Sequence, residues 1–546
     1  MSLPSANYGS VRSTDKTECH RNDGNPSMTK ASDASPSIRP TVYRRFWIVS
    51  TLLTIIAVVV VVLVGVGWYP TDHVSTELAL PRSEELSSIP MLGMMTSDTS
   101  SLSKRGQSVK AVRDDIPMFM AGLADPYHPV DNTDGYLVML VAENKLMWHE
   151  MAAKIQHVQS TTTLPEWIFT YGSMTGQADF CAAMAKVFQK WIRQGPVDAQ
   201  YVKVQAGAGS VLAQLSYLLG DPSDGVLVTA PNYPAFAGDF GIYGGMKLHT
   251  IQATAASAST TDNFVPTTAH LNEAYQRAAD AGNPPRILII CQPNNPTGTL
   301  YSADTMRRLI TWALDRGLHV VSDEIYALSV FPGIHTTSAA DIMYELSQSG
   351  KESSDDINDD DETADDGRYL GDYVHIVAGL SKDWGMSGFR VGTLFSHNTK
   401  LLQALDLIGY YPAVSQYTQH VLTHVMADDA WMDWYIGENQ QRLWDTYQAL
   451  VAALERIQVP VIPAQGALFA WVDFSAYLLP GQTEKELWSE LFKSAKILFT
   501  TGESCHENKP GMFRVVYPCP EGGPIAMKEL GDRLVRWKQQ REQSTL

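Results

Sequence analysis

The sequence is most informative at the segment Leu380-Ser381-Lys382-Asp383-Trp384-Gly385-Met386-Ser387-Gly388-Phe389-Arg390. It follows an apolar run, Val374-His375-Ile376-Val377-Ala378, which predicts a buried strand. A lysine at the end of such a strand can lose water, and its pKa then falls until the amine is neutral. Schiff-base chemistry with an aldehyde cofactor requires a neutral amine. The segment therefore predicts a nucleophilic Lys382, with Ser381 and Arg390 placed to hold an anionic group of the cofactor.

Two further strands are predicted upstream of this lysine. One is Ile287-Leu288-Ile289-Ile290-Cys291-Gln292, which is followed by a turn rich in Pro, Asn and Gly. A helical pattern covers about residues 302–316, and the second strand covers residues 318–326. Strand, helix and strand in this order predict a parallel, doubly wound sheet.

Four polar side chains are predicted at the carboxyl ends of these strands, where ligands bind in such sheets. They are Asn295, Asp323, Tyr326 and Lys382. A helix-capping role for Asp323 and a core role for Tyr326 would each be ordinary for a single residue. Those roles do not explain why all four residues fall at strand ends, so a shared ligand site is the better prediction.

Several short motifs occur in one order over about residues 131–520. They are Asn132-Thr133-Asp134-Gly135, Leu140-Val141-Ala142-Glu143-Asn144, Ala206-Gly207-Ala208-Gly209-Ser210, Ala230-Pro231-Asn232-Tyr233-Pro234, Asn295-Pro296-Thr297-Gly298, Ser322-Asp323-Glu324-Ile325-Tyr326, Ser381-Lys382-Asp383, Gly388-Phe389-Arg390-Val391-Gly392, Thr418-Gln419-His420, Ser504-Cys505-His506 and Phe513-Arg514-Val515. With these motifs the chain resembles the class I/II aminotransferases that depend on pyridoxal 5'-phosphate (PLP). Within that family it is most similar to 1-aminocyclopropane-1-carboxylate (ACC) synthase.

The resemblance implies a role for each residue that would contact the cofactor ring. Lys382 would carry PLP covalently and later shuttle the substrate's α-proton. Asp323 would pair with the pyridine nitrogen and keep it protonated, which makes the ring an electron sink. Asn295 and Tyr326 would hydrogen-bond the ring's phenolic oxygen, and Tyr233 would stack on the ring face.

The resemblance also implies how phosphate and substrate are held. Ala208 and Gly209 open a predicted helix and would offer backbone N–H groups to the phosphate, beside Ser381 and Arg390. Arg514 would bind the substrate α-carboxylate. Glu143 would meet the amine side of the substrate.

Two positions depart from the family pattern. Met174 stands where a tyrosine normally reaches a phosphate across the dimer, with Tyr171 three residues earlier. Gly379 stands where ACC synthases often have a serine that helps to hold the phosphate. Both changes affect the phosphate site and leave the reacting centre intact, so the exact substrate stays open.

The expected fold is α/β, the PLP-dependent transferase fold type I. A large, mostly parallel domain is expected at about residues 170–410, and a smaller α/β domain would complete a catalytic region at 116–546. A helical stretch near residues 431–456 would bridge the two. Because the family's active site forms at a dimer interface, the resemblance implies a homodimer.

Composition agrees with an enzyme that does not bind nucleic acid. The 546 residues carry a formal net charge of −18, which argues against a polyanionic partner. Nine of the acidic residues lie in one polar insert at 351–368, which is expected to form a surface loop. The five cysteines include no Cys-x-x-Cys pair, so neither a zinc site nor a disulfide framework is predicted.

The N-terminal region predicts a membrane anchor. Residues 1–45 form a polar tail, residues 46–69 carry no charge, and residues 70–115 form a polar tether. About 20 apolar residues span a bilayer, and aromatic residues stand at both ends of this run. Arg44 and Arg45 place the N-terminus in the cytosol and the catalytic region on the other side. The cytosolic cofactor and substrate implied by the resemblance favour the opposite orientation, so the side stays open.

Three functions are compatible with these observations. The first is ACC synthesis from S-adenosylmethionine, with loss of methylthioadenosine. The second is transamination between a common amino acid and a 2-oxo acid. The third is an inactive, membrane-tethered binding protein, which the retention of Lys382, Asp323, Tyr326 and Arg514 argues against.

Overall fold

The structure is a computed structural model that describes residues 102–108, 115–193, 195–253, 264–352 and 370–545. The predicted tail, the predicted span at 46–69, most of the tether and nearly all of the acidic insert lie outside these ranges. Within the described ranges, no helix has both the length and the apolar character needed to cross a bilayer.

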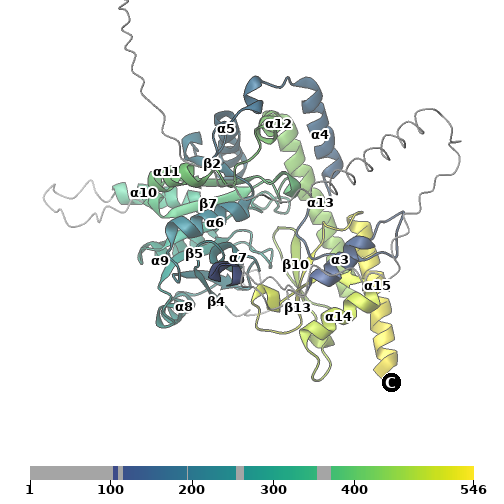
Figure 1. Ribbon diagram of the computed structural model, residues 1–546. Helices are drawn as coiled ribbons and strands as arrows, with labels where there is room; N and C mark the ends of the chain where they lie inside the picture. Colours follow the sequence, from purple (N-terminus) through teal and green to yellow (C-terminus); the bar gives the residue numbers. More distant parts are fainter. Residues whose placement is uncertain (1–101, 109–114, 194, 254–263, 353–369, 546) are drawn as a thin grey trace, which may run out of the picture. The chain divides into compact units, whose positions relative to one another are not determined.

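A seven-stranded sheet forms the centre of the large domain, in the order β2-β8-β7-β6-β5-β3-β4 (Figure 1). Strand β8 runs antiparallel to both of its neighbours, and every other neighbouring pair is parallel. The prediction of a mostly parallel sheet is therefore confirmed. Its strands are β2 (Val202–Gln205), β3 (Gly225–Ala230), β4 (Lys247–Gln252), β5 (Pro285–Cys291), β6 (His319–Asp323), β7 (Val374–Gly379) and β8 (Gly392–Ser396).

Both faces of this sheet are buried, which explains why its strands read as continuous apolar runs. In β5, Ile287 and Ile289 belong to one core cluster, whereas Leu288 and Ile290 belong to a second cluster. The first cluster includes α6 and α7, and the second includes α5, α8, α9 and α10. The sheet is thus enclosed between two helical layers.

Several of the described helices, namely α8, α9, α11, α12, α13 and α14, begin at a residue whose side chain caps the first turn. For α9, predicted at 302–316, the Ser302 hydroxyl accepts a hydrogen bond from the Thr305 amide at 3.2 Å and starts the helix. The helices are α2 (Lys104–Ser108), α3 (Ile116–Ala124), α4 (Trp148–Thr161), α5 (Ala178–Val187), α6 (Ala208–Leu219), α7 (Phe236–Gly241), α8 (Thr268–Asp280), α9 (Ala303–Leu314), α10 (Ala339–Glu352), α11 (Thr399–Ile408), α12 (Gln416–Met426), α13 (Asp429–Glu455), α14 (Glu484–Ala495) and α15 (Pro524–Thr545).

A smaller α/β domain is built from the C-terminal third and the segment before α4. Its antiparallel sheet has the order β12-β13-β10-β9, and a parallel pair joins β1 to β11. The strands are β1 (Leu137–Val138), β9 (Val461–Ile462), β10 (Phe469–Asp473), β11 (Ile497–Leu498), β12 (Thr500–Thr501) and β13 (Met512–Val516). A β1–β11 pair joins residues about 360 positions apart, so the segment before α4 belongs to this domain.

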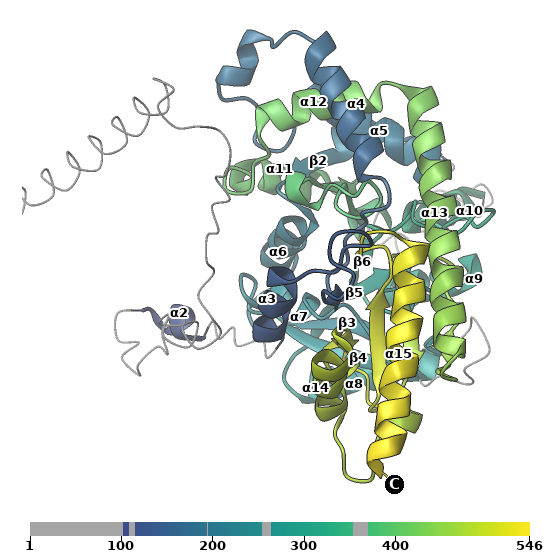
Figure 2. The same cartoon turned by 90° about the vertical axis from the view of Figure 1, so that its right-hand side faces the viewer.

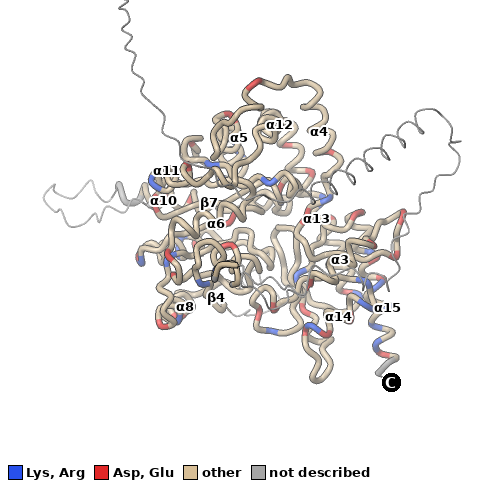
Figure 3. Tube along the Cα trace, in the orientation of Figure 1, with Lys and Arg blue, Asp and Glu red and all other residues tan. Residues whose placement is uncertain are grey.

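Helix α13 connects the two domains, as predicted for residues 431–456. Its first half, including Met432 and Tyr435, packs in the second core cluster, and its second half, including Leu443 and Leu450, packs in the first. The helix runs beside α15, as Figure 2 shows. Charged residues of both signs are interspersed along the described trace (Figure 3).

Candidate active site

The carboxyl ends of β5, β6 and β7 lie side by side in the sheet. The chain reaches Asn295 four residues after β5, Asp323 is the last residue of β6, and Lys382 follows β7 by three residues. Tyr326 lies in the turn that follows Asp323. The structure therefore brings the four strand-end residues to one edge of the sheet, where parallel sheets bind ligands.

Lys382 occupies an environment that favours its neutral form. Loss of water lowers its pKa to about 8, and the nearby cations Arg514 and Arg390 act in the same direction. The carboxylates of Glu143 and Asp323 oppose this effect. The amine is therefore available as a nucleophile and proton carrier near neutral pH.

Asp323 is buried at the end of β6 without a cationic side chain in direct contact among the described residues. Burial raises the pKa of this carboxyl to about 7. The Ile325 amide, 3.4 Å from Oδ1, and the charge of Lys382 only partly offset the effect. The sequence predicted an anion at this position. Burial therefore disfavours the charged carboxylate, and a cation bound beside it would stabilise that form.

Asp239 is a second acid near this position that the sequence did not single out. It lies on α7, where burial and the Asp323 charge raise its pKa to about 7. A Cβ built on Gly209 would stand 3.7 Å from Oδ1 of Asp239. The carboxyl therefore faces the first turn of α6, but no sequence pattern connects α7 with that turn.

Arg514 is fixed on β13 by several acceptors. Its Nη1 donates to Asn295 Oδ1 at 2.9 Å, and Nη2 donates to the Leu140 carbonyl at 2.8 Å and to Thr500 Oγ1 at 3.1 Å. Its Nε is buried without a hydrogen-bond partner among the described residues. The small domain thus delivers a buried, oriented guanidinium to the end of β5, with one donor still available to an anion.

The N-terminus of α6 forms the candidate phosphate cradle. Gly207 precedes the helix with φ +90°, which favours glycine, and a side chain there would collide with Arg390 Nη2. Ala208 and Gly209 then supply the first amides of the helix, which point along its axis. The structure therefore brings Ala208, Gly209 and Arg390 together, while Ser381 is buried beside Lys382.

The two predicted tyrosines lie in the same region in different environments. Tyr326 is buried, with its ring edge-on to Phe469 at 5.2 Å, and burial raises its pKa well above 10. Tyr233 is half-buried, with its ring perpendicular to Phe236 at 5.2 Å. The charges of Tyr233 and Asp323 both act on Tyr326, which places the three side chains near one another.

Glu143 meets the turn that follows Lys382. The Lys382 Nζ donates to the Ala142 carbonyl at 2.6 Å, and the Ser387 hydroxyl donates to Glu143 Oε1 at 3.2 Å. Of the residues predicted from sequence, Glu143 is thus placed beside the nucleophile. Ser387 was missed, because nothing in its local sequence indicates a contact 244 positions away.

The structure shows the surroundings of Gly379 and Met174, the two residues that depart from the family pattern. At Gly379, the last residue of β7, a Cβ would stand 2.7 Å from the Val391 carbonyl, so this strand end has no room for a serine without a shift. Met174 lies in the loop before α5, where its carbonyl is close to Gly409. The absence of a side chain at residue 379 is therefore part of the packing of the β7 end against the start of β8.

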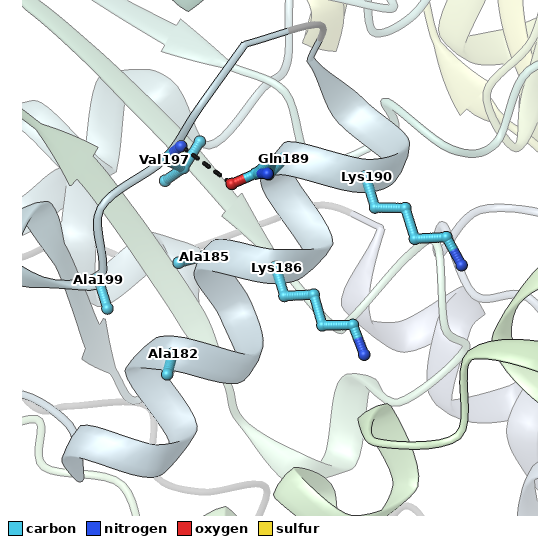
Figure 4. Close-up of a pocket in the computed structure, with 7 residues that line it drawn as sticks. All are labelled: Ala182, Ala185, Lys186, Gln189, Lys190, Val197 and Ala199. Atoms are coloured by element: carbon cyan, nitrogen blue, oxygen red, sulfur yellow. Dashed lines mark hydrogen bonds between the residues drawn. The ribbon is translucent and has the colours of Figure 1, made fainter. Parts of the chain in front are cut away.

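A hollow of about 460 Å³ lies away from this edge of the sheet. It is lined by residues of α5, the π-turn after α5 and the loop before β2, namely Ala182, Ala185, Lys186, Gln189, Lys190, Val197 and Ala199. Lys186 and Lys190 extend away from Val197 and Ala199 (Figure 4), and they pair with Asp429 and Asp433 of α13. No predicted site residue lines this hollow.

The family model "Aminotransferase class I and II" matches residues 140–525, which contain every predicted site residue. The chain belongs to this aminotransferase family. Among curated relatives, this chain is 31% identical over 436 residues to 1-aminocyclopropane-1-carboxylate synthase 6 of Oryza sativa subsp. japonica. The aligned region covers 76% of this chain and 75% of the relative. The chain is 30% identical over 466 residues to 1-aminocyclopropane-1-carboxylate synthase 3 of the same species, covering 83% of this chain and 99% of the relative.

Solved structures agree with the aminotransferase fold. An aspartate aminotransferase from Thermus thermophilus crystallised with maleate matches with a TM-score of 0.63 at 17% identity, covering 80% of this chain and 99% of the other. An aromatic aminotransferase from Pyrococcus horikoshii matches with a TM-score of 0.60 at 17% identity, covering 74% and 96%. At this identity the structural likeness establishes the fold. The expected fold type I is thereby confirmed, and the protein is an enzyme of this family.

Proposed function

We propose that this enzyme binds PLP and converts S-adenosylmethionine to ACC, with release of methylthioadenosine. The observation that carries the proposal is the placement of Glu143 beside Lys382, at the edge of the sheet that also holds Asp323 and Arg514. Relatives at 30–31% identity that bear the ACC synthase name support the choice of substrate.

The residues present fit PLP. Asp323 is a buried carboxyl that needs a cation, and Lys382 is an amine with a lowered pKa. The cradle at Gly207 is one that a Cβ would fill, and the α6 N-terminus favours a phosphate dianion. When bound, PLP supplies an electron sink for the charge left at the substrate's α-carbon.

With PLP bound, each of these side chains would have a separate role toward the substrate. Arg514 binds the substrate α-carboxylate through its free donor and holds it against Asn295. The Lys382 amine, which is about half neutral at pH 8, accepts the α-proton. Tyr326 and the core around Phe469 exclude water from this side of the site, which strengthens each charge interaction.

Transamination is the second candidate function, because Met174 and Gly379 change the phosphate site relative to ACC synthases. The two reactions are distinguished by product. The purified catalytic region is incubated with S-adenosylmethionine, and separately with an amino acid plus 2-oxoglutarate. Formation of ACC and methylthioadenosine supports the proposal, whereas formation of glutamate without ACC would replace it with transamination.

We further propose that the enzyme is a homodimer. Large exposed side chains lie on two segments that approach each other where Gly409 meets Met174. They are Tyr171, Leu407 and Tyr411, which are 89%, 84% and 87% exposed, and we call them the 171/411 face. The Pro412 carbonyl accepts a hydrogen bond from the Ala206 amide at 2.7 Å, so this face borders the phosphate cradle. An apolar face of this kind is costly to leave in water.

Sedimentation of the catalytic region tests the dimer. Leu407→Glu should convert a dimer to monomers, because it places a charge in the covered face. Tyr243→Glu is the matched control, because Tyr243 is 71% exposed on a different segment, after α7. A wild-type monomer at micromolar concentration would contradict the proposal.

We also propose that residues 46–69 anchor the enzyme in a membrane, on the basis of their length and lack of charge. The full-length protein should remain with membranes through a carbonate wash. Release by such a wash would show that these residues do not span the bilayer.

A further inference from the structure

The turn after Lys382 contacts the 140–144 segment at two consecutive residues. Lys382 Nζ donates to the Ala142 carbonyl at 2.6 Å, and Ser387 Oγ donates to Glu143 Oε1 at 3.2 Å. The partners are 240 and 244 positions apart in the chain, so the tertiary fold sets both contacts. The nucleophile and the carboxylate beside it are thus held by the same turn.

The same serine also contacts Arg390 of the phosphate cradle. The Ser387 carbonyl accepts a hydrogen bond from Arg390 Nη1 at 2.9 Å and lies 3.4 Å from the Arg390 amide. Ser387 begins a short 3-10 turn that ends at Phe389, and Arg390 follows with φ +53°. Ser387 therefore contacts both Arg390, which is predicted to bind the phosphate, and Glu143, which is predicted to meet the substrate.

We propose that Ser387 is a positioning residue of this active site, whose hydroxyl holds the Glu143 carboxylate beside the Lys382 amine. The inference rests on the proposed function for the roles of Glu143 and Lys382. A hydroxyl that donates to a carboxylate makes a charge-assisted contact, and at 3.2 Å this one is longer than the short, strong examples but still limits the orientation of the carboxylate. Without it, the flexible glutamate side chain would regain rotamer freedom and turn toward solvent.

The position of the Glu143 charge has a measurable consequence at Lys382. Burial and the cations Arg514 and Arg390 lower the pKa of the amine, and the Glu143 and Asp323 carboxylates raise it. The buried thiol of Cys519 is a further ionisable group close enough to interact electrostatically with both Lys382 and Glu143. If the Glu143 carboxylate moves away, one of the two groups that keep the amine protonated is lost, and its pKa falls further.

The test measures the titration of Lys382 itself. The full chain, freed of bound aldehyde with hydroxylamine, is labelled with trace acetic anhydride across a pH series, and acetylation of the Lys382 peptide is quantified by mass spectrometry. Ser387→Ala should lower the midpoint by about half a unit or more, which is roughly a threefold change in neutral amine at a fixed pH below the midpoint. Ser387→Thr, which keeps the hydroxyl, should titrate like the wild type.

Two further variants identify the cause. Glu143→Gln should lower the midpoint as Ser387→Ala does, and the double variant should shift it no further, because both changes remove one interaction. Ser347→Ala is the matched control, because within the part of the chain that the structure describes the Ser347 hydroxyl bonds only to the Tyr344 carbonyl on α10. It should leave the midpoint unchanged.

A Ser387→Ala protein with the wild-type midpoint would overturn the proposal, whether or not Glu143→Gln shifts it. Additive shifts in the double variant would also overturn it, because the hydroxyl would then act independently of the carboxylate. Failure of the proposed function is distinguishable, because the titration needs neither PLP nor substrate. That failure would appear as a wild-type chain that titrates normally but develops no visible absorbance with added PLP.

Discussion

Replacing Asp323 by asparagine keeps the shape of the side chain and removes its charge. In the cofactor-free protein, burial raises the pKa of this carboxyl from 3.8 to about 7, a difference of about three units. Each unit corresponds to about 1.36 kcal/mol, so the unpartnered anion costs the folded state about 4 kcal/mol above pH 7. A protonated ring nitrogen would offset this cost, which makes the carboxylate and the cofactor mutually stabilising.

The sign of the pH dependence follows from proton binding. Between about pH 4 and pH 7 the folded state keeps a proton that the unfolded state has released. The contribution of Asp323 to stability therefore falls as the pH rises through this window, and the full cost is present above it. Asp323→Asn should raise the unfolding free energy of the cofactor-free protein at pH 8 by up to about 4 kcal/mol, with the gain shrinking toward pH 4.

The substitution Asp323→Asn should also lower the turnover of the PLP-bound enzyme. If the carboxylate contributes a few kcal/mol to the transition state, its loss lowers turnover about 10²-fold or more, since each ~1.4 kcal/mol is a factor of ten. Urea unfolding at pH 5 and pH 8 measures the first effect, and steady-state kinetics measures the second.

Asp383→Asn provides the contrast for this experiment. Burial raises its pKa to about 7 as well, but its carboxyl accepts from Ser329 Oγ at 2.7 Å and from the Leu328 amide at 3.1 Å. Asparagine there keeps one acceptor oxygen in place of two, so Asp383→Asn should be less stabilising than Asp323→Asn at both pH values. Its effect should also improve toward pH 8, because the Asp383 carboxyl titrates in the same window. Equal pH dependence in wild type and Asp323→Asn, or unchanged turnover, would refute the reasoning about Asp323.

The remaining predictions concern the nucleophile, the carboxylate clamp and the N-terminal region. Lys382→Ala should abolish turnover and the visible absorbance of bound PLP, and a fully active variant would exclude this lysine as the nucleophile. Arg514→Gln should raise KM for the amino-acid substrate at least tenfold, because a charge-assisted contact is lost and Asn295 loses its partner; an unchanged KM would place the carboxylate elsewhere. A chain that begins at Ser108 should be soluble and bind PLP as the full-length protein does, because the chemistry lies beyond residue 130; failure to bind would show that the N-terminal region contributes to the catalytic fold.

The local sequence was sufficient to predict the central strands and helices and the order in which the site residues occur along the chain. The apolar runs at β5, β6 and β7 predicted buried parallel strands, because a strand covered on both faces needs apolar residues at every position. Parallel strands share one carboxyl edge, so the convergence of Asn295, Asp323 and Lys382 could also be predicted. The motif order then indicated the family before any tertiary contact was known.

Contacts between distant segments could not be predicted in this way. The Ser387–Glu143 and Arg514–Asn295 hydrogen bonds join residues more than 200 positions apart, and the packing of the two domains decides which atoms meet. The raised pKa of Asp323 has the same origin, because it depends on how much water the surrounding elements exclude. Residue type and local pattern therefore fixed which groups stand at the site. The tertiary structure decided their charge states and partners, because desolvation and hydrogen-bond geometry exist only after the distant segments have packed together.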